Sequence, residues 1–180
     1  MKVKHPRGLL LALIGSLALA APAGAGAAQA SDEVAYSLVK EIEQHRAQTW
    51  HRQRVMGIRP TRTTFLERRA GSLDVLRELR DTWRTRALRT RKRLIRPPHR
   101  SAWLCIHRFE GAWNDPNAPY YGGLQMDITF QRTYGRYLLR RKGTANRWTP
   151  AEQMWVAEKA LRAGRGFYPW PNTARRCGLL

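Results

Sequence analysis

The sequence predicts a mainly helical α+β protein, in which a basic helical region precedes a small domain with one short β-hairpin. Apolar residues recur at three- and four-residue spacing in several segments of the 180-residue chain, as in amphipathic helices. The segment Arg96-Pro97-Pro98-His99 separates the two parts, because consecutive prolines favour extended backbone. The pair Gly122-Gly123, flanked by tyrosines and a leucine, is typical of a tight hairpin or of backbone that passes close to a ligand.

The first 30 residues have the pattern of a secretory signal peptide. Three basic residues come first, Lys2, Lys4 and Arg7, and an apolar run over residues 9–20 follows. Ala28-Gln29-Ala30 then provides a small-x-small cleavage site. The apolar run is shorter than the roughly 20 residues that span a bilayer, which makes an uncleaved membrane anchor the weaker alternative. We expect a secreted, cell-wall protein whose mature chain begins after residue 30.

The chain is strongly basic, with 33 Lys and Arg residues against 13 Asp and Glu residues and a formal net charge of +20 at pH 7. Such a molecule is attracted to polyanions. For an exported protein these are the anionic polymers and lipid head groups of the cell envelope. Nucleic acid is therefore a poor candidate partner.

Residues 31–100 are expected to form a basic helical arm. One helix is predicted over about residues 32–54, with Pro60 beyond its end, and a second over about residues 64–94, with a weak point at Gly71-Ser72 where the serine could cap a restart. The apolar residues at helical spacing are Val34, Leu38 and Ile42 in the first helix and Leu73, Leu76, Trp83 and Ala87 in the second. A solvated linker, an electrostatic tether to the wall and a nucleic-acid-binding arm all remain open interpretations.

The domain at residues 101–180 is expected to contain three helices, over about residues 101–109, 129–139 and 150–162. In the first, Trp103, Ile106, His107 and Glu110 lie on one face, whereas Cys105 points elsewhere. The third begins at Thr149-Pro150-Ala151-Glu152, which combines an N-cap, a proline at the first position and a capping box.

The chain has two cysteines, Cys105 and Cys177. In an oxidising compartment an even pair favours one disulfide, which would stabilise the fold by roughly 4 kcal/mol on the chain-entropy estimate. Two unpaired buried thiols are the alternative. A metal site built from two such distant cysteines is not expected.

Glu110 is the candidate proton donor, because it ends an aromatic-rich apolar run that begins at Trp103. A carboxyl group held against apolar surface resists ionisation, and a carboxylic acid that stays protonated can give its proton to a leaving group. The alternative is a helix-end carboxylate paired with Arg108 or a neighbouring arginine. The nearby His107 is interpreted as a residue that packs or lines a groove.

Several separated motifs follow one another between Trp103 and Leu179. They are a glutamate near the end of a cysteine-bearing helix, a tryptophan shortly after it, Tyr-Tyr-Gly-Gly-Leu-Gln, a helix with Glu-Gln and Ala-Glu pairs, and a final Trp-Pro followed by Cys-Gly-Leu. In this order they resemble the resuscitation-promoting factor and transglycosylase-like domains. Those are secreted bacterial enzymes that cleave the cell wall and have a small lysozyme-like fold, so the resemblance implies that fold and that activity for residues 101–180.

The resemblance also implies a role for individual residues, with Glu110 as the catalytic acid. The implied substrate-binding residues are Trp113, Tyr121, Gly122, Gly123 and Gln125, and the implied disulfide joins Cys105 to Cys177. In the best-known members the cysteine directly precedes the glutamate and Ser-Gly-Gly follows it, whereas here four residues intervene and Gly111-Ala112 follows. The missing serine removes a small hydrogen-bonding neighbour of the acid.

A hydrolytic glycosidase usually needs two carboxylates, and Asp127, two residues after Gln125, is the best second candidate, assigned to substrate binding. A lytic transglycosylase needs one. In that mechanism Glu110 protonates the glycosidic oxygen of the bond from N-acetylmuramic acid to N-acetylglucosamine. It then takes a proton from the sugar's own C6 hydroxyl, which closes a 1,6-anhydro ring. No residue cluster has metal-ligand spacing and no glycine-rich phosphate loop is present, so no metal or cofactor is expected.

The expected partners are peptidoglycan glycan strands and anionic cell-envelope polymers, with another cell-wall hydrolase as a further candidate. Two other classes of function stay open. One is a non-catalytic peptidoglycan-binding module with the same fold. The other is an exported basic protein that binds nucleic acid or membrane through residues 31–100.

Overall fold

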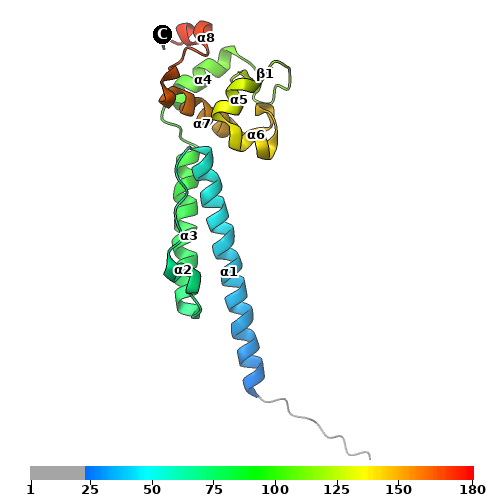
Figure 1. The fold of residues 1–180 in the computed structure, drawn as a ribbon, viewed down its shortest axis with the longest axis vertical. Helices are drawn as coiled ribbons and strands as arrows, with labels where there is room; N and C mark the ends of the chain where they lie inside the picture. The colour runs from blue at the N-terminus through cyan, green and yellow to red at the C-terminus, as the bar shows by residue number, and fades with distance from the viewer. Residues whose placement is uncertain (1–22) are drawn as a thin grey trace, which may run out of the picture.

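The computed structural model describes residues 23–180, as a long pair of helices that projects from a small helical domain (Figure 1). The predicted basic stretch and apolar run of the signal peptide lie outside the described residues. The described chain is mainly helical, with one two-stranded antiparallel sheet. The predicted mainly helical α+β class is therefore confirmed.

The projecting part is a helical hairpin, in which α1 (Ala23–Val55) packs along α3 (Leu73–Leu94) and the short α2 (Phe65–Arg69) lies in the connection (Figure 1). A buried apolar cluster holds the two long helices together: Leu38, Ile42, Leu76 and Trp83. The restart predicted at Gly71-Ser72 is confirmed, because the Ser72 side chain accepts a hydrogen bond from the Val75 amide at 3.4 Å and caps α3.

The prediction that the first helix begins near residue 32 is wrong, because α1 begins at Ala23. Alanine has the highest helix propensity, and the Ala-rich residues before Ser31 continue the helix in the N-terminal direction. The predicted cleavage residues Ala28-Gln29-Ala30 therefore lie inside α1. Val34, one of the apolar residues at helical spacing in the predicted first helix, is 42% exposed. The N-terminal part of α1 reaches past α3 (Figure 1).

The C-terminal domain is built around α7 (Pro150–Ala160), which is buried over most of its length. The predicted capping box of α7 is confirmed, with Thr149 and Glu152 bonded to each other's backbone amides. The elements around α7 are α4 (Arg100–Phe109), β1 (Tyr120–Tyr121), β2 (Met126–Asp127), α5 (Ile128–Tyr134), α6 (Arg136–Lys142), η1 (Ala145–Arg147), η2 (Leu161–Arg165) and α8 (Pro171–Arg176).

The single helix predicted over residues 129–139 is two helices, α5 and α6, divided at Gly135. A Cβ atom at Gly135 would lie 2.4 Å from the ring of Trp148, so the glycine leaves the space that this buried tryptophan occupies. Trp148 is remote in sequence. The break follows from tertiary packing, which a local spacing pattern does not contain.

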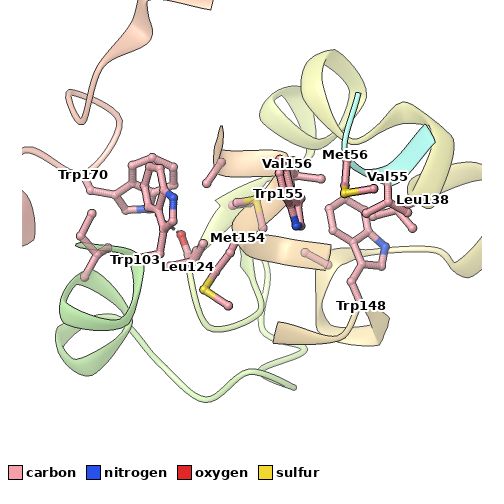
Figure 2. Close-up of a cluster of buried hydrophobic side chains, with 14 residues drawn as sticks. Val55, Met56, Trp103, Leu124, Leu138, Trp148, Met154, Trp155, Val156 and Trp170 are labelled. Carbon is pink, nitrogen blue, oxygen red and sulfur yellow. Dashed lines mark hydrogen bonds between the residues drawn. The ribbon is translucent and has the colours of Figure 1, made fainter. Parts of the chain in front are cut away.

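The helical hairpin is continuous with the core of the C-terminal domain, because Val55 and Met56 at the end of α1 are fully buried in the same cluster as Trp155 (Figure 2). Hydrogen bonds reinforce the junction: Trp155 Nε1 donates to the Leu94 carbonyl at 2.7 Å, and Arg162 Nη2 donates to the Met56 carbonyl at 2.8 Å. The other labelled core side chains are Trp103, Leu124, Leu138, Trp148, Met154, Val156 and Trp170 (Figure 2).

Two glutamates of α7 are both buried, at 3% exposure for Glu152 and 1% for Glu158. Lys142 Nζ donates to both oxygens of Glu152 at 2.7 Å. Burial alone would raise the pKa of Glu152, but interactions with His51 and Lys142 outweigh burial and lower the pKa to about 2. Glu158 accepts hydrogen bonds from Trp103 Nε1 and the His99 amide, each at 2.8 Å.

The lowered pKa of Glu152 predicts a specific loss of stability in acid. The folded-state pKa of about 2 lies below the ordinary 4.5, so the carboxylate stabilises the fold above pH 4.5 and this stabilisation disappears as the pH falls from 4.5 to 2. We expect Glu152→Gln to lower the free energy of unfolding by about 1–3 kcal/mol at pH 7 and by far less at pH 2. Urea unfolding at both pH values measures this, with the exposed Glu78→Gln as control; an equal loss at both would contradict it.

Candidate functional site

A cavity of about 250 Å³ opens where α4, the β-hairpin and the start of α8 meet. Its volume is just below the roughly 300–1,000 Å³ of small-molecule sites, which suits part of a chain molecule. The residues that line it are Glu110, Tyr120, Gln125, Pro169, Trp170, Pro171 and Asn172. Among these described residues Glu110 is the one ionisable carboxyl group.

Glu110 follows the last residue of α4 and is half-buried at the cavity wall. Its Oε1 accepts a hydrogen bond from Thr173 Oγ1 at 2.8 Å. Within residues 23–180 no arginine, lysine or histidine forms an ion pair with it, so the alternative pair with Arg108 is absent from the described chain. One carboxyl oxygen is thus fixed by a neutral donor, and the group remains available to a ligand.

Thr173 is a site residue that the sequence did not indicate. It lies on α8, one turn before Cys177, and the predicted disulfide between Cys105 and Cys177 is present, with an S–S distance of 2.06 Å. This bond ties α8 to α4, the helix that directly precedes Glu110. The hydroxyl that contacts Glu110 thus comes from a threonine 63 positions later in the chain. In the sequence, the one indication of this role is that Thr173 lies four residues before Cys177. On a helix this spacing places Thr173 on the same side as the cysteine.

Gln125 is held in a fixed orientation beside Glu110. Its φ of 46° is positive, which no other non-glycine residue of the described chain shows, and such backbone strain is often found at functional sites. Its Nε2 donates to Asp115 Oδ2 at 2.8 Å and to the Gly122 carbonyl at 3.0 Å. Both amide hydrogens are thus engaged, so the side-chain oxygen is left as the acceptor for a ligand.

Asp115 acts as an acceptor in this arrangement. A hydrogen bond from the Asn117 backbone and a second from the Gln125 side chain lower the pKa of Asp115 below its usual range. An ionised carboxylate at neutral pH cannot serve as the proton donor. A Cβ atom at Gly111 would lie 2.8 Å from Gln125 Nε2 and 3.2 Å from Asp115 Oδ2, so the glycine after Glu110 gives room to this pair.

The paired glycines lie against protein. Gly122 has a φ of 74°, and a Cβ atom there would lie 2.5 Å from Gln153 Oε1, which accepts a hydrogen bond from the Gly123 amide at 2.9 Å. Gln153 is fully buried and its Nε2 also donates to the Trp113 carbonyl at 2.7 Å. The close approach that the glycines permit is therefore to Gln153 of α7, which holds the turn of the β-hairpin in place.

We expect Gly122→Ala to lower the free energy of unfolding by at least about 1–3 kcal/mol, because it combines a positive φ with a steric overlap. Gly71→Ala is the matched control: a Cβ atom at Gly71 would meet no atom within 4 Å, and we expect a change below about 0.5 kcal/mol. Thermal unfolding followed by circular dichroism measures both. Equal stability of the two variants would contradict the proposed contact.

The structure does not bring the other predicted site residues to the cavity lining. Trp113 stacks on His107 with ring centroids 3.9 Å apart, and His107 Nδ1 lies 3.0 Å from the Gly123 carbonyl. Tyr121 pairs with Met126 across the β-hairpin. Asp127 Oδ1 accepts from the Phe130 amide at 2.6 Å, so Asp127 is the N-cap of α5.

Two aromatic residues that were not predicted at the site line the cavity, Tyr120 and Trp170. Tyr120 is 50% exposed. Trp170 is 4% exposed and its Nε1 donates to the Leu124 carbonyl at 2.6 Å, so it belongs to the core and also forms part of the cavity wall. An aromatic wall next to a carboxyl group and an amide can bind the apolar face of a sugar ring.

Residues 23–180 contain no group of three or more His, Cys, Asp or Glu side chains that could hold a metal ion. In the same part of the chain, no helix combines the length and the apolar composition that crossing a bilayer requires. Searches of protein-family models, of curated proteins and of solved structures find no match to this chain.

Proposed function

We propose that the protein is a secreted enzyme that cleaves peptidoglycan at the bond from N-acetylmuramic acid to N-acetylglucosamine, as a lytic transglycosylase with Glu110 as its single acid and base. The observation that carries this proposal is the position of Glu110. Its carboxyl group lies in a cavity of about 250 Å³ beside an oriented amide and an aromatic wall, and it has no ion pair in the described chain. The order of the sequence motifs between Trp103 and Leu179 also supports peptidoglycan as the substrate.

Glu110 acts in both steps of the proposed reaction, first as an acid and then as a base. Protonated Glu110 donates its proton to the glycosidic oxygen, and the bond from that oxygen to the anomeric carbon breaks. The carboxylate then removes the proton from the C6 hydroxyl of the muramic acid residue, whose oxygen bonds to the anomeric carbon. The proton that leaves Glu110 in the first step is thereby replaced in the second.

The remaining residues bind and orient. Thr173 fixes one oxygen of Glu110, so that the other oxygen meets the glycan. The free side-chain oxygen of Gln125 is suited to accept the N–H of an acetamido group, because its own amide hydrogens are already bonded to Asp115 and Gly122. Tyr120, which is 50% exposed, provides a surface on which a sugar ring can pack, and the buried Trp170 forms part of the cavity wall.

The other carboxylates of the domain have structural partners, which favours the mechanism that needs one carboxylate over hydrolysis by two. Asp127 caps α5, Glu152 binds Lys142, and Glu158 binds Trp103. Asp115 is bonded to Gln125 and Asn117. None of the four lines the cavity among the described residues.

Digestion of purified peptidoglycan with mass analysis of the soluble products tests this proposal. We expect muropeptides that end in 1,6-anhydro-N-acetylmuramic acid, lighter by one water than the products of hydrolysis. Products with reducing ends would contradict the single-carboxylate mechanism. Saturable binding to the insoluble wall without any soluble product would identify a non-catalytic binding module instead.

A further inference from the structure

A second cavity, of about 120 Å³, lies between α1 and α3 of the helical hairpin. The residues that line it are His45, Gln48 and Arg52 from α1 and Arg84, Ala87, Leu88 and Arg91 from α3. In each helix these positions recur at three- and four-residue spacing, which places them on one face. The cavity is therefore built from two facing helical surfaces, within the arm whose role the motifs of the C-terminal domain do not explain.

Charge is unbalanced in this cavity. Three arginines line it and no carboxylate does. Four other arginines of the helical hairpin have acidic partners in the described chain: Arg46 with Glu43, Arg77 with Asp74, Arg80 with Asp81 and Arg86 with Glu67. In residues 23–180 no such ion pair involves Arg52, Arg84 or Arg91. The three guanidinium groups that line this cavity therefore have no carboxylate partner there.

Arg52 is held in position before any ligand binds. Its Nη1 donates to the Ala87 carbonyl at 2.8 Å, across the helical hairpin, and its Nη2 to Gln48 Oε1 at 3.4 Å. Burial and, after it, the charge of Arg91 lower the pKa of Arg52. Both effects disfavour the cation in the free protein, and a bound anion would relieve both.

His45 adds an unpaired polar atom. Its Nδ1 is buried and has no hydrogen-bond partner, which is uncommon because buried polar atoms are nearly always paired. His45 lines the cavity, and an oxyanion bound there offers an acceptor to an imidazole N–H. The unpartnered Nδ1 atom of His45 and the three arginines without an ion pair are two independent observations, and both favour an anion at this place.

We propose that this cavity binds one phosphate group of a flexible phosphodiester polymer of the polyol phosphate type. Planar guanidinium groups match the oxygens of a phosphate and bind them through two hydrogen bonds at once. The small volume admits a single oxyanion, and a recess between two helices is reached by a chain that can bend around it rather than by a stiff duplex. The inference does not depend on Glu110 or on cleavage.

Calorimetric titration of the whole protein with inorganic phosphate and with poly(glycerol phosphate) tests the site. We compare the double variant Arg84→Gln/Arg91→Gln with Arg77→Gln/Arg80→Gln, which removes the same charge from the same helix at arginines that already have acidic partners. We expect saturable binding of both ligands by the wild type, at least ~10-fold weaker binding by the first variant and a change below ~2-fold in the second.

Three results would overturn the proposal. Absence of saturable phosphate binding by the wild type excludes the site. Equal weakening by the two double variants shows attraction to net charge alone. Tighter binding of duplex DNA than of poly(glycerol phosphate), lost through Arg84 and Arg91, assigns the site to nucleic acid. Because Arg84 and Arg91 are exposed side chains of α3, the first variant should fold, which an unchanged helical circular dichroism spectrum checks.

Discussion

Replacing Glu110 with Gln is expected to reduce the release of muropeptides from purified peptidoglycan by at least about 100-fold. A positioned general acid and base contributes roughly 10²–10⁴-fold to a rate, and in the proposed reaction one side chain performs both roles. The amide has nearly the shape of the carboxyl group and can still accept the hydrogen bond from Thr173. We therefore expect the melting temperature and the binding of the wall to remain close to those of the wild type.

The matched control for this experiment is Glu78→Gln, the same substitution at an exposed position of α3 that does not line the cavity around Glu110. It changes the net charge equally and leaves the proposed acid in place. Wild-type rates are expected for this variant. Equal rates for Glu110→Gln and the wild type would remove Glu110 from the mechanism.

Loss of the disulfide is expected to affect both stability and activity. The bond joins residues separated by 72 positions, and the chain-entropy estimate for such a loop is about 4 kcal/mol. For a protein of this size that corresponds to a fall in melting temperature of roughly 8–16 °C. Activity should fall as well, at temperatures where the variant is still folded, because α8 carries Thr173 to Glu110.

The double variant Cys105→Ser/Cys177→Ser tests this expectation by calorimetry and by muropeptide release at about 20 °C. Wild type treated with a reductant should show the same two changes, and the double variant should not respond to the reductant. An unchanged melting temperature would contradict the stabilising role. A folded variant with full activity would show that Thr173 does not need the disulfide to reach Glu110.

Local features of the fold could be predicted from the sequence. The capping box at Thr149 and Glu152 involves residues three apart, and the restart at Ser72 depends on the amide of Val75. Each of these is decided within one helical turn. The disulfide also followed from composition, because only two cysteines are present.

Tertiary features could not be predicted in this way. The division at Gly135 depends on Trp148, and the end of α1 contributes Val55 and Met56 to a core whose other members lie mostly after residue 100. A spacing pattern carries no information about which distant surfaces meet. The start of α1 has a different cause, because the alanines before Ser31 fit both a small-x-small cleavage site and a helix.

The candidate site also contains residues that the sequence predicts and residues that only tertiary packing brings to it. The sequence motifs predict Glu110 and Gln125 as site residues, and both line the cavity. Thr173 contacts Glu110 and Trp170 lines the cavity, although both lie far from Glu110 in the sequence. Asp115 orients Gln125 from a turn. The glycine pair permits a close approach, as its sequence indicates, but its neighbour is the buried Gln153 of α7, a contact between residues 30 positions apart.

A crystal structure of the Glu110→Gln variant with a bound peptidoglycan tetrasaccharide tests the central claim most directly. We expect the side chain at position 110 to lie about 3 Å from a glycosidic oxygen, and the side-chain oxygen of Gln125 to accept the N–H of an acetamido group. A tetrasaccharide bound elsewhere on the protein, with the cavity around position 110 left open, would contradict the account.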